Sequence, residues 1–157
     1  MPETELRVRP AVPGDVPVIY RMLRESAIAQ DAEDQLCVDP GKLLEDGFGE
    51  AKRFDCLMAE LDGLPAGIAL YFLIYSTWTT RYVLYLEDLY VIAGARRRGV
   101  ARRLVSELAR VAEQLKCGQI RWLVSRNNSA AIRFYESLGA GMGSDWVPMY
   151  LEAPFPI

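Results

Sequence analysis

The chain alternates between two hydrophobic patterns, one typical of strands and one typical of helices. Apolar residues at every second position, or in short runs between turn residues, predict strands. Asp62 and Gly63 separate two such segments, and this pair tolerates the positive φ angles of a tight hairpin turn. The predicted strands cover residues 6–9, 54–61, 67–75, 83–92, 119–124 and 146–152.

Apolar residues spaced three or four positions apart predict four amphipathic helices. The first follows Asp15, which is predicted to cap it, and the second begins at Pro40, a residue suited to a first helical turn. Between them, residues 30–39 are polar and acidic, which predicts a surface loop or a broken helix. The third helix covers residues 99–116, and the fourth follows Asn128 and ends at Gly139.

Strand, helix and strand follow one another between residues 83 and 124, which predicts a βαβ unit. A crossover of this kind places its two parallel strands in one sheet, with the helix on one face. The fold class is therefore predicted to be α/β (α+β). At 157 residues, of which 51% are hydrophobic, the chain is expected to form a single domain over residues 1–157.

The composition excludes several kinds of chemistry. There is no histidine, so histidine-based nucleophilic catalysis and the usual zinc hydrolases are excluded. Cys37, Cys56 and Cys117 are too widely spaced for a disulfide framework or a metal site, and no metal is expected. A net charge of -3 argues against a nucleic-acid partner. The apolar runs are too short for a membrane span and residues 1–10 are charged, so a cytoplasmic protein is expected.

An arginine-rich loop joins the strand at residues 83–92 to the long third helix. The first turn of a helix leaves backbone N–H groups unpaired and carries partial positive charge, and Gly99 removes a side chain that would block a pyrophosphate. Five arginines surround this point, and the spacing fits neither the dinucleotide-binding glycine pattern nor the P-loop. The loop predicts an anion site. The alternatives are a solvated surface cluster, or contact with nucleic acid or an acidic protein.

Arg96, Gly99 and Ala101 match the form Arg/Gln-x-x-Gly-x-Gly/Ala, and the loop resembles the cofactor loop of the GNAT acetyltransferase superfamily. Other segments similar to this superfamily, and to its diamine (spermidine/spermine) and thialysine acetyltransferase branch, are residues 43–50, 85–91 and 128–140. The resemblance covers roughly the whole chain. It implies a GNAT fold with a central mixed, mostly antiparallel twisted sheet, a splayed pair of parallel strands, and helices on both faces.

The resemblance also implies that acetyl-CoA is the acetyl donor and co-substrate. Its pantetheine arm would insert beside the strand at residues 89–91, and the loop amides would hold its pyrophosphate. Asn128 would lie beside the pantetheine arm, with helix capping as the alternative role. The residues expected to bind acetyl-CoA are Leu89, Tyr90, Val91, Arg96, Arg97, Arg98, Gly99, Val100, Ala101, Arg102, Asn128 and Ala131.

Acetyl transfer to an amine requires a base, because an alkylammonium with a pKa of about 10.4 is protonated at neutral pH, and an acid for the departing thiolate. With no histidine, Glu87 is the predicted base, acting through a water, and the resemblance points to the same residue; Asp88 is the alternative. Neighbours in a strand point to opposite faces unless a bulge intervenes. A buried carboxylate is costly, which favours a functional role. Tyr135 is the predicted acid, with core packing as the alternative.

The acidic residues that this branch places around a polycation are only partly present. Gln30 and Ser76 stand where the resemblance leads us to expect acidic residues, whereas Trp78 is kept. The predicted substrate-binding residues are Glu87, Asp88, Gln30 and Trp78.

These features predict acetyl transfer to a primary amine of a small molecule that is a polyamine, thialysine-like or amino-acid-like. The alternatives are a non-catalytic acyl-CoA sensor and a protein or peptide N-acetyltransferase. The resemblance further implies a homodimer built with the strand after Gly143.

Overall fold

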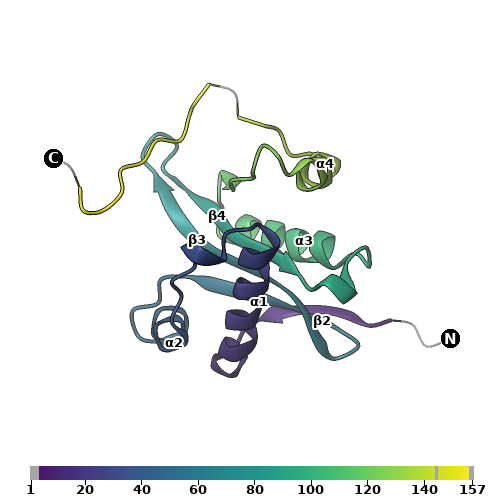
Figure 1. Ribbon diagram of the computed structural model, residues 1–157. Coiled ribbons are helices and arrows are strands. Elements are labelled where there is room, and N and C mark those ends of the chain that lie inside the picture. The colour runs from purple at the N-terminus through teal and green to yellow at the C-terminus, as the bar shows by residue number, and fades with distance from the viewer. Residues whose placement is uncertain (1–3, 144, 156–157) are drawn as a thin grey trace. The chain divides into compact units, whose positions relative to one another are not determined.

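The computed structural model of the chain describes residues 4–143 and 145–155 (Figure 1). These residues divide into two compact units, the first ending at Leu123 and the second beginning at Val124. The second unit contains α4 (Ser129–Ser137). The first unit contains β1 (Leu6–Pro10), α1 (Val16–Ala29), α2 (Pro40–Phe48), β2 (Asp55–Leu61), β3 (Leu64–Ser76), β4 (Arg81–Val91), α3 (Val100–Gln114) and β5 (Gln119–Arg121).

The five strands of the first unit form one sheet in the order β1-β2-β3-β4-β5. The first four strands pair in antiparallel fashion, and β5 runs parallel to β4, as the βαβ pattern predicts. Only Val83, Leu84 and Tyr85 of β4 pair with β5. Within the first unit, the remainder of β4 therefore has no β5 partner on that side. This mixed, mostly antiparallel sheet confirms the predicted fold class.

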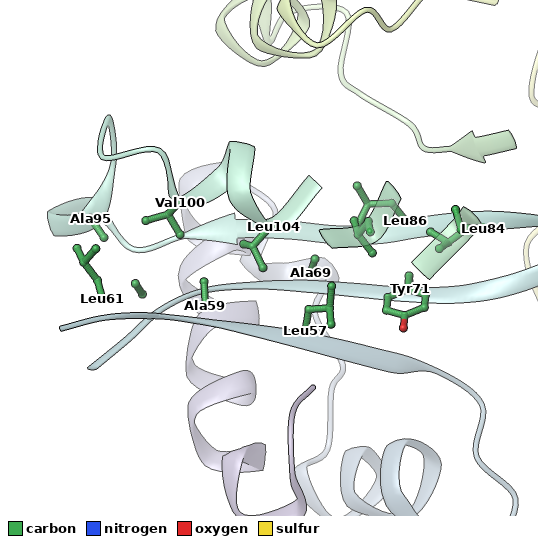
Figure 2. Packing of buried hydrophobic residues seen from close by; sticks show 13 residues of the cluster. Leu57, Ala59, Leu61, Ala69, Tyr71, Leu84, Leu86, Ala95, Val100 and Leu104 are labelled. Carbon is green, nitrogen blue, oxygen red and sulfur yellow. The ribbon is translucent and has the colours of Figure 1, made fainter. Parts of the chain in front are cut away.

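Helices of the first unit cover both faces of this sheet, as predicted. On one face, α3 buries its apolar stripe against the strands, and Figure 2 shows these side chains filling the space between helix and sheet. This cluster includes Leu57, Ala59, Ala69, Tyr71, Leu84, Leu86, Val100, Leu104 and Leu108. On the other face, α1 packs against the same strands, in a cluster that includes Ile19, Met22, Leu23, Cys56, Met58 and Ile68. Each fully buried aliphatic side chain contributes about 1.5–3 kcal/mol, so the two clusters fix the sheet between its helices.

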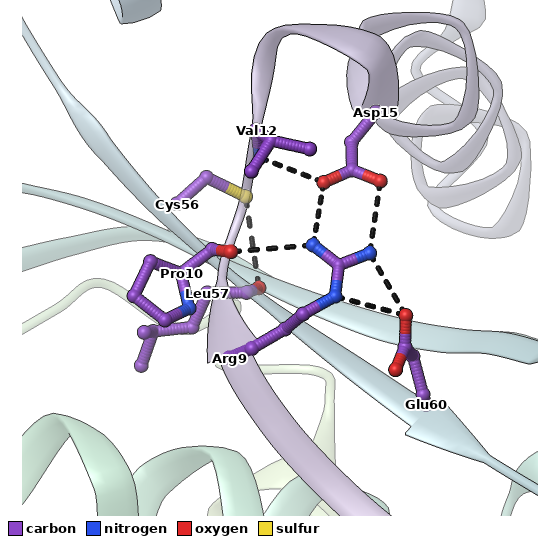
Figure 3. Close-up of polar contacts among 7 residues, drawn as sticks. All are labelled: Arg9, Pro10, Val12, Asp15, Cys56, Leu57 and Glu60. Carbon is purple, nitrogen blue, oxygen red and sulfur yellow. Dashed lines mark hydrogen bonds and ion pairs between the residues drawn. The ribbon is translucent and has the colours of Figure 1, made fainter. Parts of the chain in front are cut away.

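A cluster of ion pairs fastens β1 and the start of α1 to β2. The guanidinium of Arg9 donates to both carboxylate oxygens of Asp15, at 2.7 and 3.1 Å, and its Nε donates to Oε1 of Glu60 at 2.9 Å (Figure 3). Asp15 occupies the N-cap position of α1, as predicted, but its side chain makes no cap hydrogen bond to that helix and instead accepts from the Val12 N–H at 2.8 Å. The bonds from Arg9 lower the pKa of Asp15, because they stabilise its ionised form.

Two predicted strands differ from the structure. The strand predicted at residues 119–124 is shorter in the structure, where β5 covers Gln119–Arg121. The hairpin turn is as predicted, with φ angles of 52° at Asp62 and 78° at Gly63. Residues 146–152 form no strand, because the described part of the second unit offers no other strand to pair with their backbone groups. The expected single domain over residues 1–157, and the segment after Gly143 that was expected to form a dimer, include some residues outside the described ranges. These are residues 1–3, 144 and 156–157.

Candidate active site

A β-bulge in β4 lies at Glu87 and Asp88, the predicted base and its alternative. Leu86 pairs with Tyr71 of β3 and Asp88 pairs with Leu70, so Glu87 is an extra residue in the ladder. The bulge changes the alternation of side chains: Leu84 and Leu86 face α3 before it, whereas Leu89 and Val91 face α3 after it. Glu87 and Asp88 therefore both point to the α1 face of the sheet.

An open pocket of about 270 Å³ lies on that face, between α1, the segment after it and β4. Glu87 and Asp88 line it from β4, and Gln30, at the end of α1, lines it from the other side. The first unit thus brings together three of the four predicted substrate-binding residues. The other residues that line the pocket are Leu23, Ser26, Ala27, Ala32, Gln35 and Leu36.

The two carboxyl groups of this pocket differ in their surroundings. Asp88 is half-buried, whereas Glu87 is exposed. Burial raises the pKa of Asp88 from 3.8 to about 6, and the negative charge of Glu87 adds to the increase. At pH 7 to 8 Asp88 is therefore mostly ionised but is a stronger base than an ordinary carboxylate.

The arginine loop before α3 has the geometry of an anion site. Arg97 and Gly99 both adopt left-handed backbone conformations, with φ of 60° and 80°, and Gly99, at the N-cap position of α3, makes no side-chain cap hydrogen bond. Turns of this kind present several N–H groups to one point, and the α3 macrodipole adds positive charge there. Arg96, Arg98 and Arg102 are exposed around this turn. These backbone N–H groups and arginine side chains are hydrogen-bond donors that suit the pyrophosphate of acetyl-CoA.

Arg96 connects this loop to β4. Its Nε donates to the carbonyl oxygen of Val91 at 3.2 Å, and its guanidinium carbon lies 5.9 Å from the centre of the Tyr90 ring. The Tyr90 hydroxyl in turn donates to Glu25 of α1 at 3.2 Å. Leu89 and Val91 pair with β3 on one side only, so their backbone lies at the part of β4 that β5 does not cover.

Three predicted site residues lie in the second unit: Asn128 and Ala131, expected to bind acetyl-CoA, and Tyr135, the predicted acid. Oδ1 of Asn128 accepts from the N–H of Ala131 at 3.1 Å, so the capping role of Asn128 is confirmed. The Tyr135 ring lies 5.2 Å from that of Phe134, and burial raises the pKa of Tyr135. A raised pKa keeps the phenol protonated at neutral pH, which is the form that a general acid requires.

The sequence did not identify most of the neutral residues that line the pocket. The pocket wall formed by α1 and its C-terminal end could have been predicted from the helical period, because its residues Leu23, Ala27 and Gln30 lie four and three positions apart. Gln35 and Leu36 come from the loop, whose path the sequence pattern does not determine. Trp78, predicted to bind substrate, lies in the turn between β3 and β4 with 86% of its surface exposed and does not line this pocket.

Other sequence predictions concern metals, cysteines and membranes. Residues 4–143 and 145–155 contain no group of three or more His, Cys, Asp or Glu side chains that could hold a metal ion. Cys37, Cys56 and Cys117 are free thiols. Within the same ranges, every helix is too short or too polar to span a bilayer.

Comparison with known proteins identifies a protein family that this chain matches. Residues 19–140 match the profile of the acetyltransferase (GNAT) family. A thialysine N-epsilon-acetyltransferase of Sus scrofa is 39% identical over 141 residues, which are 85% of this chain and 82% of the relative. A spermidine/spermine N(1)-acetyltransferase-like protein 1 of Homo sapiens is 35% identical, over 85% of this chain but only 20% of that longer protein.

A solved structure shows the same fold at lower identity. The crystal structure of an aminoglycoside acetyltransferase from an uncultured soil metagenomic sample, in complex with sisomicin, has a TM-score of 0.78 to this chain. The match covers 94% of this chain and 95% of the other, with 15% sequence identity.

Proposed function

This chain belongs to the acetyltransferase (GNAT) family and is an acetyl-CoA-dependent N-acetyltransferase, and we propose that it acetylates a primary amine of a small molecule. One observation carries the proposal: the bulge turns two carboxylates into one pocket, on the strand that leads to the arginine loop. Paired carboxylates favour an ammonium group, and the loop favours the phosphates of the donor. The thialysine and spermidine/spermine names of the relatives support a polyamine, thialysine-like or amino-acid-like acceptor.

Acetyl-CoA supplies the thioester carbonyl that the amine nitrogen attacks. The loop amides and arginines at residues 96–102 bind its pyrophosphate, and the backbone of Leu89, Tyr90 and Val91 pairs with its pantetheine arm. The free edge of β4 supports this assignment, because that backbone has no β5 partner within the first unit. Asn128 and Ala131, at the start of α4, are assigned to the same donor, and the chain is assigned to a single domain.

The carboxyl pair removes the proton from the bound ammonium. Glu87 takes it through a water, and Asp88, whose pKa is raised by burial, is the alternative base. The amine then forms the N–C bond while the C–S bond breaks, and Tyr135 donates a proton to the departing sulfur. Backbone N–H groups near Leu89 stabilise the negative charge on the carbonyl oxygen.

A homodimer is also part of the proposal. Trp146, Met149 and Tyr150 of the C-terminal segment each expose more than 80% of their surface and form no strand in the second unit. An exposed apolar segment of this kind is suited to pack against a second copy of the chain. Sedimentation at micromolar concentration is expected to give twice the mass of one chain, and a single-chain mass would contradict this part.

Two substitutions test the catalytic roles. Glu87→Gln and Tyr135→Phe keep the size of each side chain but remove the proton acceptor or donor, so each is expected to lower kcat by about 10²–10⁴-fold. Release of CoA is measured with acetyl-CoA and a panel of amines that includes spermidine, thialysine, amino acids and a peptide N-terminus.

Matched controls use exposed residues of the same types. Glu113→Gln on α3 and Tyr75→Phe on β3 make the same chemical changes and are expected to leave kcat unchanged. Wild-type kcat in both Glu87→Gln and Tyr135→Phe would refute the assigned roles. Binding of acetyl-CoA with no acetylation of any amine would instead favour an acyl-CoA sensor, and acetylation of the peptide alone would favour a peptide N-acetyltransferase.

A further inference from the structure

The acceptor pocket has charged residues on one wall only. Glu87 and Asp88 on β4 are its charged residues, and among the described residues that line it there is no Lys or Arg. The walls formed by α1 and the following loop present a hydroxyl, two carboxamides and small or aliphatic side chains, from Ser26, Gln30, Gln35, Leu23, Ala27, Ala32 and Leu36. The pocket therefore offers one place for an ammonium group and neutral polar groups elsewhere.

The nearby acidic residues do not add a second ammonium site. Glu33 in the loop pairs with Arg24 of α1 at 3.1 Å, so its charge is already compensated. Asp31 and Asp34 are exposed in the same loop and do not line the pocket.

Gln30 is held in an orientation that leaves an acceptor for a ligand. Its Nε2 donates to the carbonyl oxygen and the hydroxyl of Ser26, at 3.2 and 3.1 Å. The amide donors are thus engaged within α1, whereas the carbonyl oxygen of Gln30 can accept from a hydroxyl or amide group.

This inference rests on the small-amine acetyltransferase proposed above but departs from the polyamine, thialysine-like and amino-acid-like acceptors that the relatives' names support. We infer that the acceptor is an amine with a single ammonium group and an uncharged, hydrogen-bonding tail, of the amino alcohol or amino amide class. Gln30 and Gln35 select it. A carboxylate would find no cation on these walls and would be repelled by Glu87 and Asp88, and a second ammonium would find no carboxylate there. A hydroxyl or amide instead gains hydrogen bonds from the neutral polar groups of these walls.

A matched series of four-carbon amines tests the inference. The compounds 4-aminobutan-1-ol, 4-aminobutanamide, 1,4-diaminobutane and 4-aminobutanoate share one chain and differ only in the tail group. With saturating acetyl-CoA, we expect kcat/KM for the alcohol and the amide to exceed that for the diamine and the amino acid by up to about tenfold, the effect of one neutral hydrogen bond.

Charge substitutions test the two glutamines. Gln30→Glu and Gln35→Glu each place a carboxylate on the neutral walls and are expected to raise the ratio of kcat/KM for the diamine over the alcohol by about tenfold. Gln114→Glu on α3 makes the same charge change away from this pocket and is expected to leave the ratio unchanged. An unchanged ratio in both pocket variants would overturn the assignment of the glutamines.

The wild-type result separates the two levels of the proposal. Preference for the diamine or the amino acid would overturn the inference while the small-amine acetyltransferase stands. Turnover of none of the four compounds, nor of the wider amine panel, would remove the proposed function and the inference with it.

Discussion

Asp88→Asn is expected to stabilise the protein while it impairs the reaction. Burial and the charge of Glu87 raise the pKa of Asp88 from 3.8 to about 6, so its ionised form is disfavoured in the folded state. The difference, 6 minus 3.8, is about two pKa units, which at about 1.4 kcal/mol per unit corresponds to roughly 3 kcal/mol. Asparagine has nearly the same shape and no charge, so the variant avoids this cost.

The pH dependence of the stabilisation follows from the two pKa values. Below pH 3.8 Asp88 is protonated in both the folded and the unfolded chain, and above pH 6 it is ionised in both. The wild type therefore loses stability relative to the variant as the pH rises between these values. The expected advantage of Asp88→Asn is about 3 kcal/mol at pH 7.5 and about 0.5 kcal/mol at pH 4.

Urea unfolding followed by tryptophan fluorescence at these two pH values measures the difference. With a slope of about 2 kcal/mol per molar urea, the midpoint at pH 7.5 is expected to rise by about 1.5 M. Asp34→Asn, at an exposed loop position, is the control and is expected to change stability by less than about 0.5 kcal/mol at either pH. An advantage of equal size at both pH values, or a loss of stability at pH 7.5 alone, would refute the assigned pKa.

Two further substitutions test how the sheet is held around the site. Arg9→Met leaves the carboxylates of Asp15 and Glu60 without their shared cation and is expected to cost about 3 kcal/mol at pH 7 in urea unfolding. Because the folded pKa of Asp15 is lowered, this contribution is present above its unfolded pKa and is lost as the pH falls; an equal cost at pH 3 would contradict the ion-pair account. Gly67→Ala would place a Cβ 2.7 Å from the Tyr90 carbonyl oxygen, and a loss of about 1–3 kcal/mol is expected. Thermal unfolding measures this loss against Gly14→Ala, where a Cβ meets nothing within 4 Å, and equal melting temperatures would contradict it.

Local signals were enough to predict most elements of the fold. The period of apolar residues gave α1, α3 and α4, and the Asp62-Gly63 pair gave the turn between β2 and β3, because each depends on residues close in sequence. The strand predicted at residues 146–152 did not form. A strand depends on a partner that lies elsewhere in the chain or in another chain, and apolar residues in extended order do not supply one.

The candidate site divides in the same way. The residue types Glu87 and Asp88, and the arginine loop with Gly99, were identified as the chemical groups because their identity and order are written in the sequence. From the sequence, the alternation of side chains along a strand predicted that the two carboxylates would point to opposite faces of the sheet unless a bulge intervened. The ladder contains that bulge, and an extra residue depends on how β4 aligns with β3, which no residue pattern within β4 specifies.

The sequence by itself determined which chemistry is available: no histidine, a carboxyl pair before an anion-binding turn, and a tyrosine on a later helix. Only the tertiary structure decided which groups share a pocket and how strongly they are charged. The bulge set the direction of Glu87, and the packing of α1 left Asp88 half-buried. The loop after α1 placed Gln35 in the same pocket as Gln30. These outcomes depend on distances between residues far apart in the chain, and both desolvation and charge interaction are functions of those distances.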